Sequence, residues 1–267
     1  MRDLTITLIQ TTTAWHDAPA NRLAYDEQLE HLDVAGDVVV LCEMFTTGFT
    51  MASAEQAESM DGPTVAWMLE QARRLDAVIC GSVVIREADA YYNRFLWARP
   101  DGEVEHYDKR HLFRMADEQA HYAPGRARRV FEWRDWRICP QVCYDLRFPV
   151  FSRNRGDYDL LLYVANWPSP RTAQWLALLR ARAIENQCYV AGVNRIGLDG
   201  NDVPYAGGSG CWDPLGRCLV EAGEVHQVLR VGLDGAALAA YRSGFPAWKD
   251  ADRFHIEGDV AAEDGLT

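Results

Sequence analysis

Apolar side chains recur along the chain in two patterns, short alternating runs and longer runs at helical spacing. Residues 3–10 alternate and are rich in β-branched side chains, which predicts a strand. Residues 63–75 form an amphipathic run behind Pro63, which predicts a helix that begins there. By the same patterns we expect helices over 19–33 and 171–187, and strands over 37–42, 77–85, 91–98, 103–108, 128–133, 136–142, 159–165, 188–194, 209–212, 217–221 and 226–232.

This order interleaves about ten or more strands with about four helices, which is typical of an α/β or α+β fold. Two sheets with helices outside both would accommodate more strands than a simple doubly wound sheet carries. No linker, repeat or low-complexity run divides the 267 residues, so we expect a single domain over 1–267. The polar tail over 242–267 is expected either to be disordered at its end or to lie on a neighbouring subunit.

Composition narrows the classes of function. A net charge of −12 argues against nucleic acid and anionic membranes as partners, because both are bound by clustered Lys and Arg. No apolar run approaches the ~20 residues of a membrane span, and the first residues lack the apolar core of a signal peptide. The seven cysteines include no CxxC pair, so we expect no zinc ribbon, and free thiols in a reducing, cytoplasmic compartment.

Three chemically distinct side chains each follow an apolar strand directly. Glu43 follows 37–42, Lys109 follows 103–108, and Cys143 follows 136–142. Strand ends in α/β folds converge on one edge of a sheet, where sites are usually built. A carboxylate, an ammonium and a thiol that meet there would make a cysteine hydrolase without histidine.

Each of these residue types has a role in such chemistry. A thiol must lose its proton to attack, and Glu43 would take that proton and later give it to the leaving ammonia. Lys109 would stabilise the negative charge that develops on the carbonyl oxygen, with the backbone N–H of Tyr144 as a second donor. Lys109 is one of only two lysines among 27 Lys and Arg, which suggests that this position needs an ammonium. A dyad of Cys143 with His111 or His121 is the rival on pattern alone, because Cys–His is the commoner pairing.

The segments around these residues are similar to those of a known family. They are LCEMFTTGF, YDKRHLF and PQVCYDLRFP, followed by NWP at 166–168 and RARAIENQCYVAGVNR at 180–195. Together they resemble the nitrilase superfamily over about residues 3–232, and the longer DKRHLFRMADEQAHY resembles its omega-amidase branch, the 2-oxoglutaramate amidases.

The resemblance implies a fold, an assembly and a catalytic set. The fold would be a four-layer αββα sandwich that dimerises or forms a higher homo-oligomer. Glu43, Lys109 and Cys143 would be the catalytic triad, without a metal or organic cofactor. A second carboxylate, Glu118 in RMADE, would position the lysine or the attacking water. The histidines would then serve loop packing.

The implied reaction is hydrolysis of a small amide such as 2-oxoglutaramate or 2-oxosuccinamate to the dicarboxylate and ammonia, through a thioester. The substrate carboxylate should meet a cation, for which Arg171 is the candidate. Arg147 is expected to tie the turn behind the cysteine instead. The candidates to line or bind in the pocket are Phe45, Tyr144, Asn166 and Trp167.

Two alternatives stay open. The chain could catalyse another reaction of the superfamily, on a nitrile, a carbamoyl amine or an aliphatic amide, because these reactions share the triad. It could instead be a non-catalytic binding protein on the same scaffold, although an intact triad argues against that.

Overall fold

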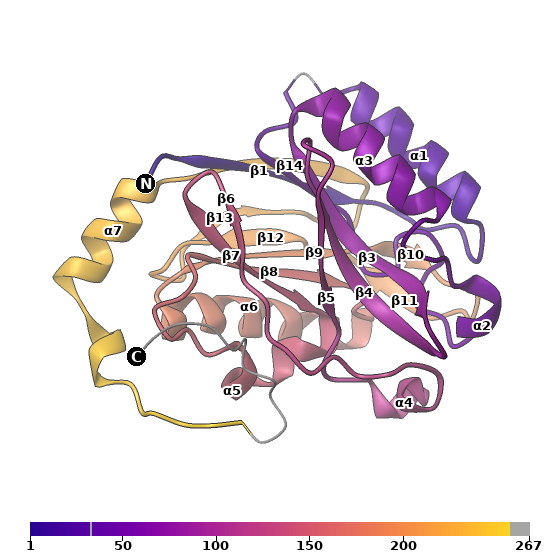
Figure 1. Cartoon of the computed structure of the whole chain (residues 1–267). Coiled ribbons are helices and arrows are strands. Elements are labelled where there is room, and N and C mark those ends of the chain that lie inside the picture. The colour runs from indigo at the N-terminus through magenta and orange to yellow at the C-terminus, as the bar shows by residue number, and fades with distance from the viewer. Residues whose placement is uncertain (33, 257–267) are drawn as a thin grey trace.

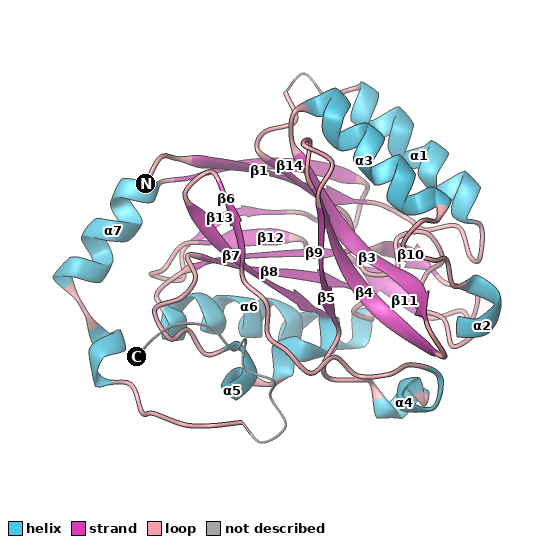
Figure 2. Ribbon diagram, in the orientation of Figure 1, coloured by secondary structure: helices cyan, strands magenta, loops and turns pink. Residues whose placement is uncertain are grey.

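Two six-stranded sheets face each other in the computed structural model, which describes residues 1–32 and 34–256 (Figures 1 and 2). The first sheet has the order β14-β1-β2-β3-β4-β5. Its central strands β1 (Leu4–Gln10), β2 (Val38–Val40) and β3 (Val78–Glu87) are parallel. The flanking strands β4 (Ala90–Ala98), β5 (Val104–Asp108) and β14 (Gln227–Leu233) pair antiparallel to their neighbours. Because two antiparallel pairings separate β5 from β3, β5 runs in the same direction as the parallel strands.

The second sheet has the order β13-β12-β9-β8-β7-β6. Here β7 (Trp136–Val142), β8 (Leu160–Ala165) and β9 (Tyr189–Asn194) are parallel. The flanking strands β6 (Phe131–Trp133), β12 (Gly210–Trp212) and β13 (Cys218–Glu221) pair antiparallel to their neighbours, and β6 and β13 are the edges. A separate hairpin joins β10 (Ile196–Leu198) to β11 (Pro204–Ala206).

Helices cover the outer face of each sheet. Helices α1 (Ala18–Glu30) and α3 (Pro63–Leu75) lie over the first sheet, and α6 (Thr172–Asn186) lies under the second (Figure 1). In α3, Val65, Met68 and Ala72 follow helical spacing and are buried, which explains why this face packs inward. These four layers confirm the αββα sandwich expected from the sequence. The shorter elements are α2 (Ser53–Gln56), α4 (Glu118–His121), α5 (Pro149–Ser152), and the 3₁₀ turns η1 (Arg114–Ala116), η2 (Cys143–Arg147), η3 (Ser169–Arg171) and η4 (Ala247–Asp250).

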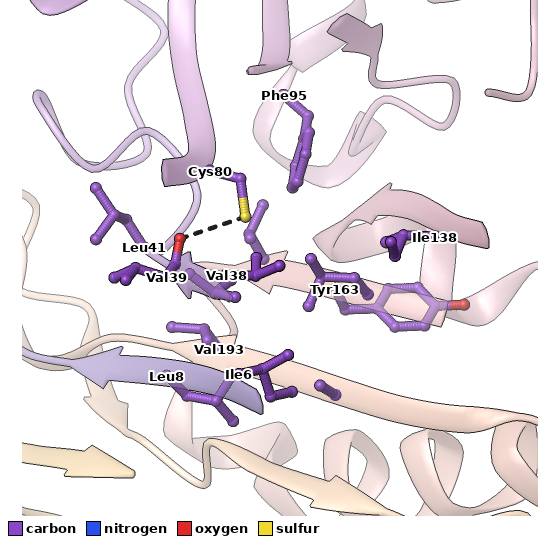
Figure 3. Close-up of a cluster of buried hydrophobic side chains, with 14 of the residues drawn as sticks. Ile6, Leu8, Val38, Val39, Leu41, Cys80, Phe95, Ile138, Tyr163 and Val193 are labelled. Carbon is purple, nitrogen blue, oxygen red and sulfur yellow. Dashed lines mark hydrogen bonds between the residues drawn. The ribbon is translucent and has the colours of Figure 1, made fainter. Parts of the chain in front are cut away.

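The core lies between the two sheets (Figure 3). Ile6, Val38 and Phe95 project from the first sheet, and Ile138 and Val193 from the second, all with no exposed surface. The Cys80 thiol within this core donates to the carbonyl oxygen of Val39 at 3.5 Å. Such residues explain the near-continuous apolar runs of the parallel strands, which are buried on both faces.

The structure contains elements that the sequence patterns did not predict. Helix α7 (Gly235–Gly244) includes the start of the segment that was expected to be a tail. Its Arg242 donates to Asp159 at 2.6 Å and to the carbonyl oxygen of Tyr158, which anchors that helix on the second sheet. The last part of the predicted tail, 257–267, lies outside the described residues. Within those residues, no helix combines the length and apolar composition that crossing a membrane requires.

Candidate active site

The carboxyl ends of strands from both sheets meet at one edge of the sandwich. Lys109 directly follows β5, Cys143 directly follows β7, and Glu43 comes three residues after β2. Within each sheet these strands run in the direction of the parallel strands, and the hydrogen bond from Asn166, which follows β8, to Glu43 brings the ends of the two sheets to the same edge. The structure therefore brings together the three residues that the sequence placed at strand ends.

Lys109 is the centre of a buried ionic cluster. Its Nζ lies 2.9 Å from Glu43 Oε1, and 2.9 and 3.0 Å from the two carboxylate oxygens of Glu118. The lysine is 1% exposed, and both carboxylates are fully buried. Burial disfavours the ammonium, but the charges of Glu118 and Glu43 outweigh this effect and raise the pKa of Lys109 above its usual range. The lysine therefore keeps its charge inside the protein.

Glu118 is held in this cluster by the loop after Lys109. Its Oε2 accepts a hydrogen bond from the backbone N–H of Phe113 at 2.5 Å, in addition to its bonds to Lys109. Burial raises the pKa of this carboxyl, Lys109 lowers it, and the nearby Glu43 charge raises it further, with a net upward shift. The structure thus places Glu118 in direct contact with Lys109, and its role stays a prediction.

The Glu43 carboxylate is fixed by donors on three sides. Besides Lys109, its Oε1 accepts from Asn93 Nδ2 at 2.7 Å, and its Oε2 accepts from the backbone N–H of Asn166 at 2.8 Å. The side chain of Asn166 also donates to the Glu43 carbonyl oxygen at 2.6 Å. Sequence reasoning missed Asn93. An asparagine inside the apolar strand 91–98 was a usable signal, because a buried amide needs polar partners.

Cys143 occupies a tight turn between β7 and the rest of η2. Its φ of +44° lies in the left-handed region, which residues with a Cβ seldom adopt. The thiol is 3.8 Å from the carbonyl oxygen of Asn166. Burial and the adjacent Glu43 carboxylate raise the pKa of Cys143 well above its usual value, and Lys109 only partly opposes them. The Cys143 side chain is therefore a neutral thiol with a carboxylate beside it.

A cavity of ≈ 820 Å³ opens over this cluster. Six of the predicted site residues line it: Arg171, and also Lys109, Cys143, Tyr144, Asn166 and Trp167. The guanidinium of Arg171 lies 5.7 Å from the centroid of the Phe113 ring. The cavity wall also includes Trp15, His16, Phe49, Phe113, Asp199, Asn201 and Tyr205.

Phe45 does not lie where it was expected. It is fully buried in the core and does not line the cavity. Its ring packs edge-on against Tyr25 of α1 at 5.5 Å and lies 5.9 Å from Trp67 of α3. The left-handed backbone of Met44, with φ +42°, separates Glu43 from Phe45, and the two side chains have different surroundings.

Arg147 lies in the cavity wall, whereas the two histidines considered as partners of the cysteine do not. Arg147 lines the cavity, 4.9 Å from the centroid of the Trp167 ring, and bonds Gln174. It is therefore a second arginine at the cavity beside Arg171, where the sequence predicted only a structural role for it. His111 stacks on Phe148 at 3.9 Å and bonds Asp145, and neither His111 nor His121 lines the cavity. The rival Cys–His dyad has no geometric support.

Acidic, cysteine and histidine side chains do not form a metal site in the described part of the chain. No group of three or more of them has the arrangement that a metal ion needs. All seven cysteines are free thiols, six of them buried.

Comparison with known proteins identifies the family. The family model described as carbon-nitrogen hydrolase matches residues 5–243. Omega-amidase YafV of Escherichia coli strain K12 is 53% identical over 258 residues, which are 96% of this chain and 100% of that protein. The 2-oxoglutaramate amidase of Bacillus subtilis strain 168 is 35% identical over 219 residues, 80% of this chain and 84% of that protein.

A solved structure agrees with these relatives. It is the crystal structure of XC1258 from Xanthomonas campestris, a CN-hydrolase superfamily protein with an arsenic adduct in the active site. The two chains share 53% sequence identity and superpose with a TM-score of 0.94. The match covers 96% of this chain and 100% of the XC1258 chain. The resemblance to the omega-amidase branch of the nitrilase superfamily is thus confirmed, and the chain belongs to the carbon-nitrogen hydrolase family.

Proposed function

We propose that this protein is an omega-amidase that hydrolyses the terminal amide of small 2-oxo acids, such as 2-oxoglutaramate and 2-oxosuccinamate, to the dicarboxylate and ammonia. The observation that carries the proposal is the buried cluster of Lys109 with Glu43 and Glu118, beside Cys143 at the base of a cavity. The relatives named as omega-amidase and 2-oxoglutaramate amidase support the choice of substrate class.

In the first half of the reaction, Cys143 is acylated. As the sulfur attacks the amide carbonyl carbon, Glu43 takes the thiol proton, so the thiolate forms only with the new S–C bond. The oxyanion is stabilised by Lys109 Nζ and by the backbone N–H of Tyr144. Glu43 then returns the proton to the amide nitrogen, the C–N bond breaks, ammonia leaves, and a thioester remains.

In the second half, water hydrolyses the thioester. Glu43 takes a proton from the water as its oxygen attacks the carbonyl carbon, and the same two donors stabilise the second oxyanion. The S–C bond breaks, the thiol regains its proton from Glu43, and the dicarboxylate leaves. Glu118 keeps Lys109 charged and in place throughout, because the lysine has two carboxylate partners.

We infer that the arginines in the cavity wall select the substrate. Arg171 and Arg147 are the two arginines in its wall, in a protein whose net charge is −12. A carboxylate in this partly enclosed space gains charge-assisted hydrogen bonds that a neutral amide cannot make. Trp167 and Tyr144 supply the apolar walls, while Asn166 acts mainly on Glu43 through its two hydrogen bonds.

The direct test is ammonia release from 2-oxoglutaramate by the wild type and by Cys143→Ala. The proposal predicts steady release by the wild type and none above background by the variant. A panel with a nitrile, a carbamoyl amine and an aliphatic amide tests the assignment within the family. If the wild type releases ammonia from a carbamoyl compound and none from 2-oxoglutaramate, the proposed substrate class is wrong.

We further propose a cytoplasmic homodimer or higher homo-oligomer. The seven free thiols support a reducing compartment. Exposed aromatic residues after α7 support a subunit contact there, since Phe245 is 59% and Trp248 47% exposed. Light scattering that detects only a 30.2 kDa species would refute the oligomer.

A further inference from the structure

Asp145 is a buried carboxylate that takes no part in the proposed reaction. It is fully buried in the turn that begins with Cys143. Its Oδ1 accepts from the backbone N–H of His111 at 3.0 Å and pairs with Nδ1 of the same residue at 2.7 Å. Its Oδ2 accepts from the Tyr107 hydroxyl at 2.8 Å and from the backbone N–H of Val142 at 2.9 Å. Each of the two carboxylate oxygens therefore has two hydrogen-bonding partners.

These partners belong to the two segments that carry the nucleophile and the lysine. Tyr107 lies two residues before Lys109 and His111 two residues after it, so both ends of the lysine segment are bound to one carboxylate. The Tyr107 hydroxyl also accepts from the backbone N–H of Arg110 at 3.1 Å, which tightens this segment further. Val142 directly precedes Cys143. Asp145 is thus a common anchor for the end of β5 and the end of β7.

The turn at Cys143 needs such an anchor. A φ of +44° is unfavourable for a residue with a Cβ and persists only where the surroundings hold it. The bond from Val142 to Asp145 holds the residue before the cysteine, and Phe148 N–H bonds the Asp145 carbonyl oxygen at 3.0 Å on the other side. This conformation also directs the N–H of Tyr144, the next residue, which the proposed reaction uses as an oxyanion donor.

We propose that Asp145 is a positioning residue for the reaction, which sets the Cys143 sulfur and the Tyr144 N–H in register with Lys109 Nζ. This inference rests on the proposed function, because it presumes that these three groups act on one carbonyl. The carboxylate touches none of the reacting atoms and acts through Val142, Tyr107 and His111.

Replacement by asparagine tests this anchor with almost no change of volume. An amide has one acceptor oxygen, while Asp145 receives a backbone N–H on each of its two oxygens. If the amide oxygen faces Val142, its NH₂ opposes the His111 N–H and loosens the lysine segment. If it faces His111, the NH₂ opposes the Val142 N–H and loosens the turn of the nucleophile. Neither orientation preserves both segments.

The matched control is Asp213→Asn. Asp213 is also buried and accepts from two backbone N–H groups, those of Leu215 and Arg217 at 2.9 Å, and from the Arg217 side chain. It lies beyond Trp212, which pairs with Val190 at the start of β9, and so at the opposite edge of the sheet from Cys143. This variant therefore reports what a lost buried carboxylate does to the fold without touching the site.

The experiment measures kcat and KM for 2-oxoglutaramate, with kcat expressed per Cys143 thiol that iodoacetamide alkylates. Unfolded protein, in which every thiol is accessible to the reagent, is first removed by size-exclusion chromatography, so the normalisation counts only folded sites. We expect kcat per thiol to fall roughly 100-fold in Asp145→Asn, because displacement of reacting groups by about 1 Å has effects of that size. KM should change less than about threefold, because Arg171 and Arg147 are untouched, and Asp213→Asn should match the wild type.

A kcat per thiol in Asp145→Asn within about twofold of the wild type overturns the positioning role. If that variant does not fold, Tyr107→Phe decides, since it removes one bond to Asp145 and keeps the carboxylate. A lower kcat at constant KM supports the role, and an unchanged kcat overturns it. A wild type that releases no ammonia overturns the proposed function instead, so the two failures are distinguishable.

Discussion

At the scale of single residues, the protonation of Cys143 distinguishes this site from one that stores a thiolate. Burial and Glu43 raise the pKa of the thiol, so deprotonation must accompany attack on the substrate. We expect the rate of alkylation by iodoacetamide to keep rising with pH beyond about 10, where an ordinary exposed thiol with a pKa near 8.5 has levelled off. Stopped alkylation followed by peptide mass analysis measures this profile for Cys143 alone. A plateau below pH 8 would contradict the neutral resting thiol.

Arg171 and Arg147 give a prediction about specificity at the same scale. The Arg171→Gln variant should lose roughly 10- to 100-fold in kcat/KM for 2-oxoglutaramate, because a hydrogen bond to a charged group contributes about 1.5–3 kcal/mol. A neutral aliphatic amide of similar length should lose little. Arg147→Gln measured in parallel shows which arginine holds the carboxylate. Equal losses for charged and neutral substrates would contradict this assignment.

Some residues of the site could be predicted from the sequence and others could not, for physical reasons. Glu43, Lys109 and Cys143 were identifiable because each follows a strand, and the direction of a strand determines where its end lies. The position of Phe45 could not be predicted. The left-handed backbone at Met44 is a local feature that no repeating pattern of apolar residues indicates. Asp145 and Asn93 were missed because their partners are distant in sequence, 38 residues away for Tyr107 and 50 for Glu43.

At the scale of elements, long patterned segments were predicted well and short ones were not. The bounds of α3 and β7 agree with the sequence pattern. Buried residues recur at helical spacing in α3 and run along almost the whole of β7. The hairpin of β10 and β11 has three residues in each strand, too few to establish alternation. Helix α7 was missed because only Gly235 and Leu238 are buried, so its apolar face is narrow.

The contact of α6 with the second sheet gives a prediction at this scale. A Cβ at Gly192 of β9 would come within 2.7 Å of Trp175 Cζ2 and 2.8 Å of Leu179 Cδ1. The Gly192→Ala variant should therefore push α6 from the sheet and lower the free energy of unfolding by about 1–3 kcal/mol. Urea denaturation measures this change.

Gly232→Ala in β14 is the matched control, because no atom lies within 4 Å of its added Cβ. It should leave the free energy of unfolding unchanged or raise it slightly, since alanine restricts the unfolded chain. If both variants are equally stable, the packing of α6 against Gly192 is not as tight as the structure implies.

At the scale of the whole molecule, the buried thiols make stability depend on pH. Burial raises the pKa of Cys139 to about 11, and also raises the pKa values of Cys42, Cys80, Cys188 and Cys211. In the unfolded chain these thiols titrate near pH 8.5. Their raised pKa values stabilise the fold fully below that pH, and the contribution is lost as pH rises toward the folded values.

We therefore expect the free energy of unfolding to fall between pH 8.5 and 11, by roughly 1.4 kcal/mol per pH unit for each thiol that ionises only on unfolding. Chemical denaturation at a series of pH values measures the slope. The Cys80→Ala variant should show a shallower fall, because it has one such thiol fewer. A free energy of unfolding that stays constant to pH 10.5 would contradict the account.

The central claim is that Cys143 carries the acyl group of the substrate, and trapping that intermediate tests it most directly. Wild-type protein is mixed with 2-oxoglutaramate, quenched in acid within one turnover, and analysed by intact mass and peptide mapping. The account predicts an added mass equal to the substrate less ammonia, on the peptide with Cys143, and none in Cys143→Ala. An adduct on another cysteine, or ammonia release by Cys143→Ala at the wild-type rate, would contradict it.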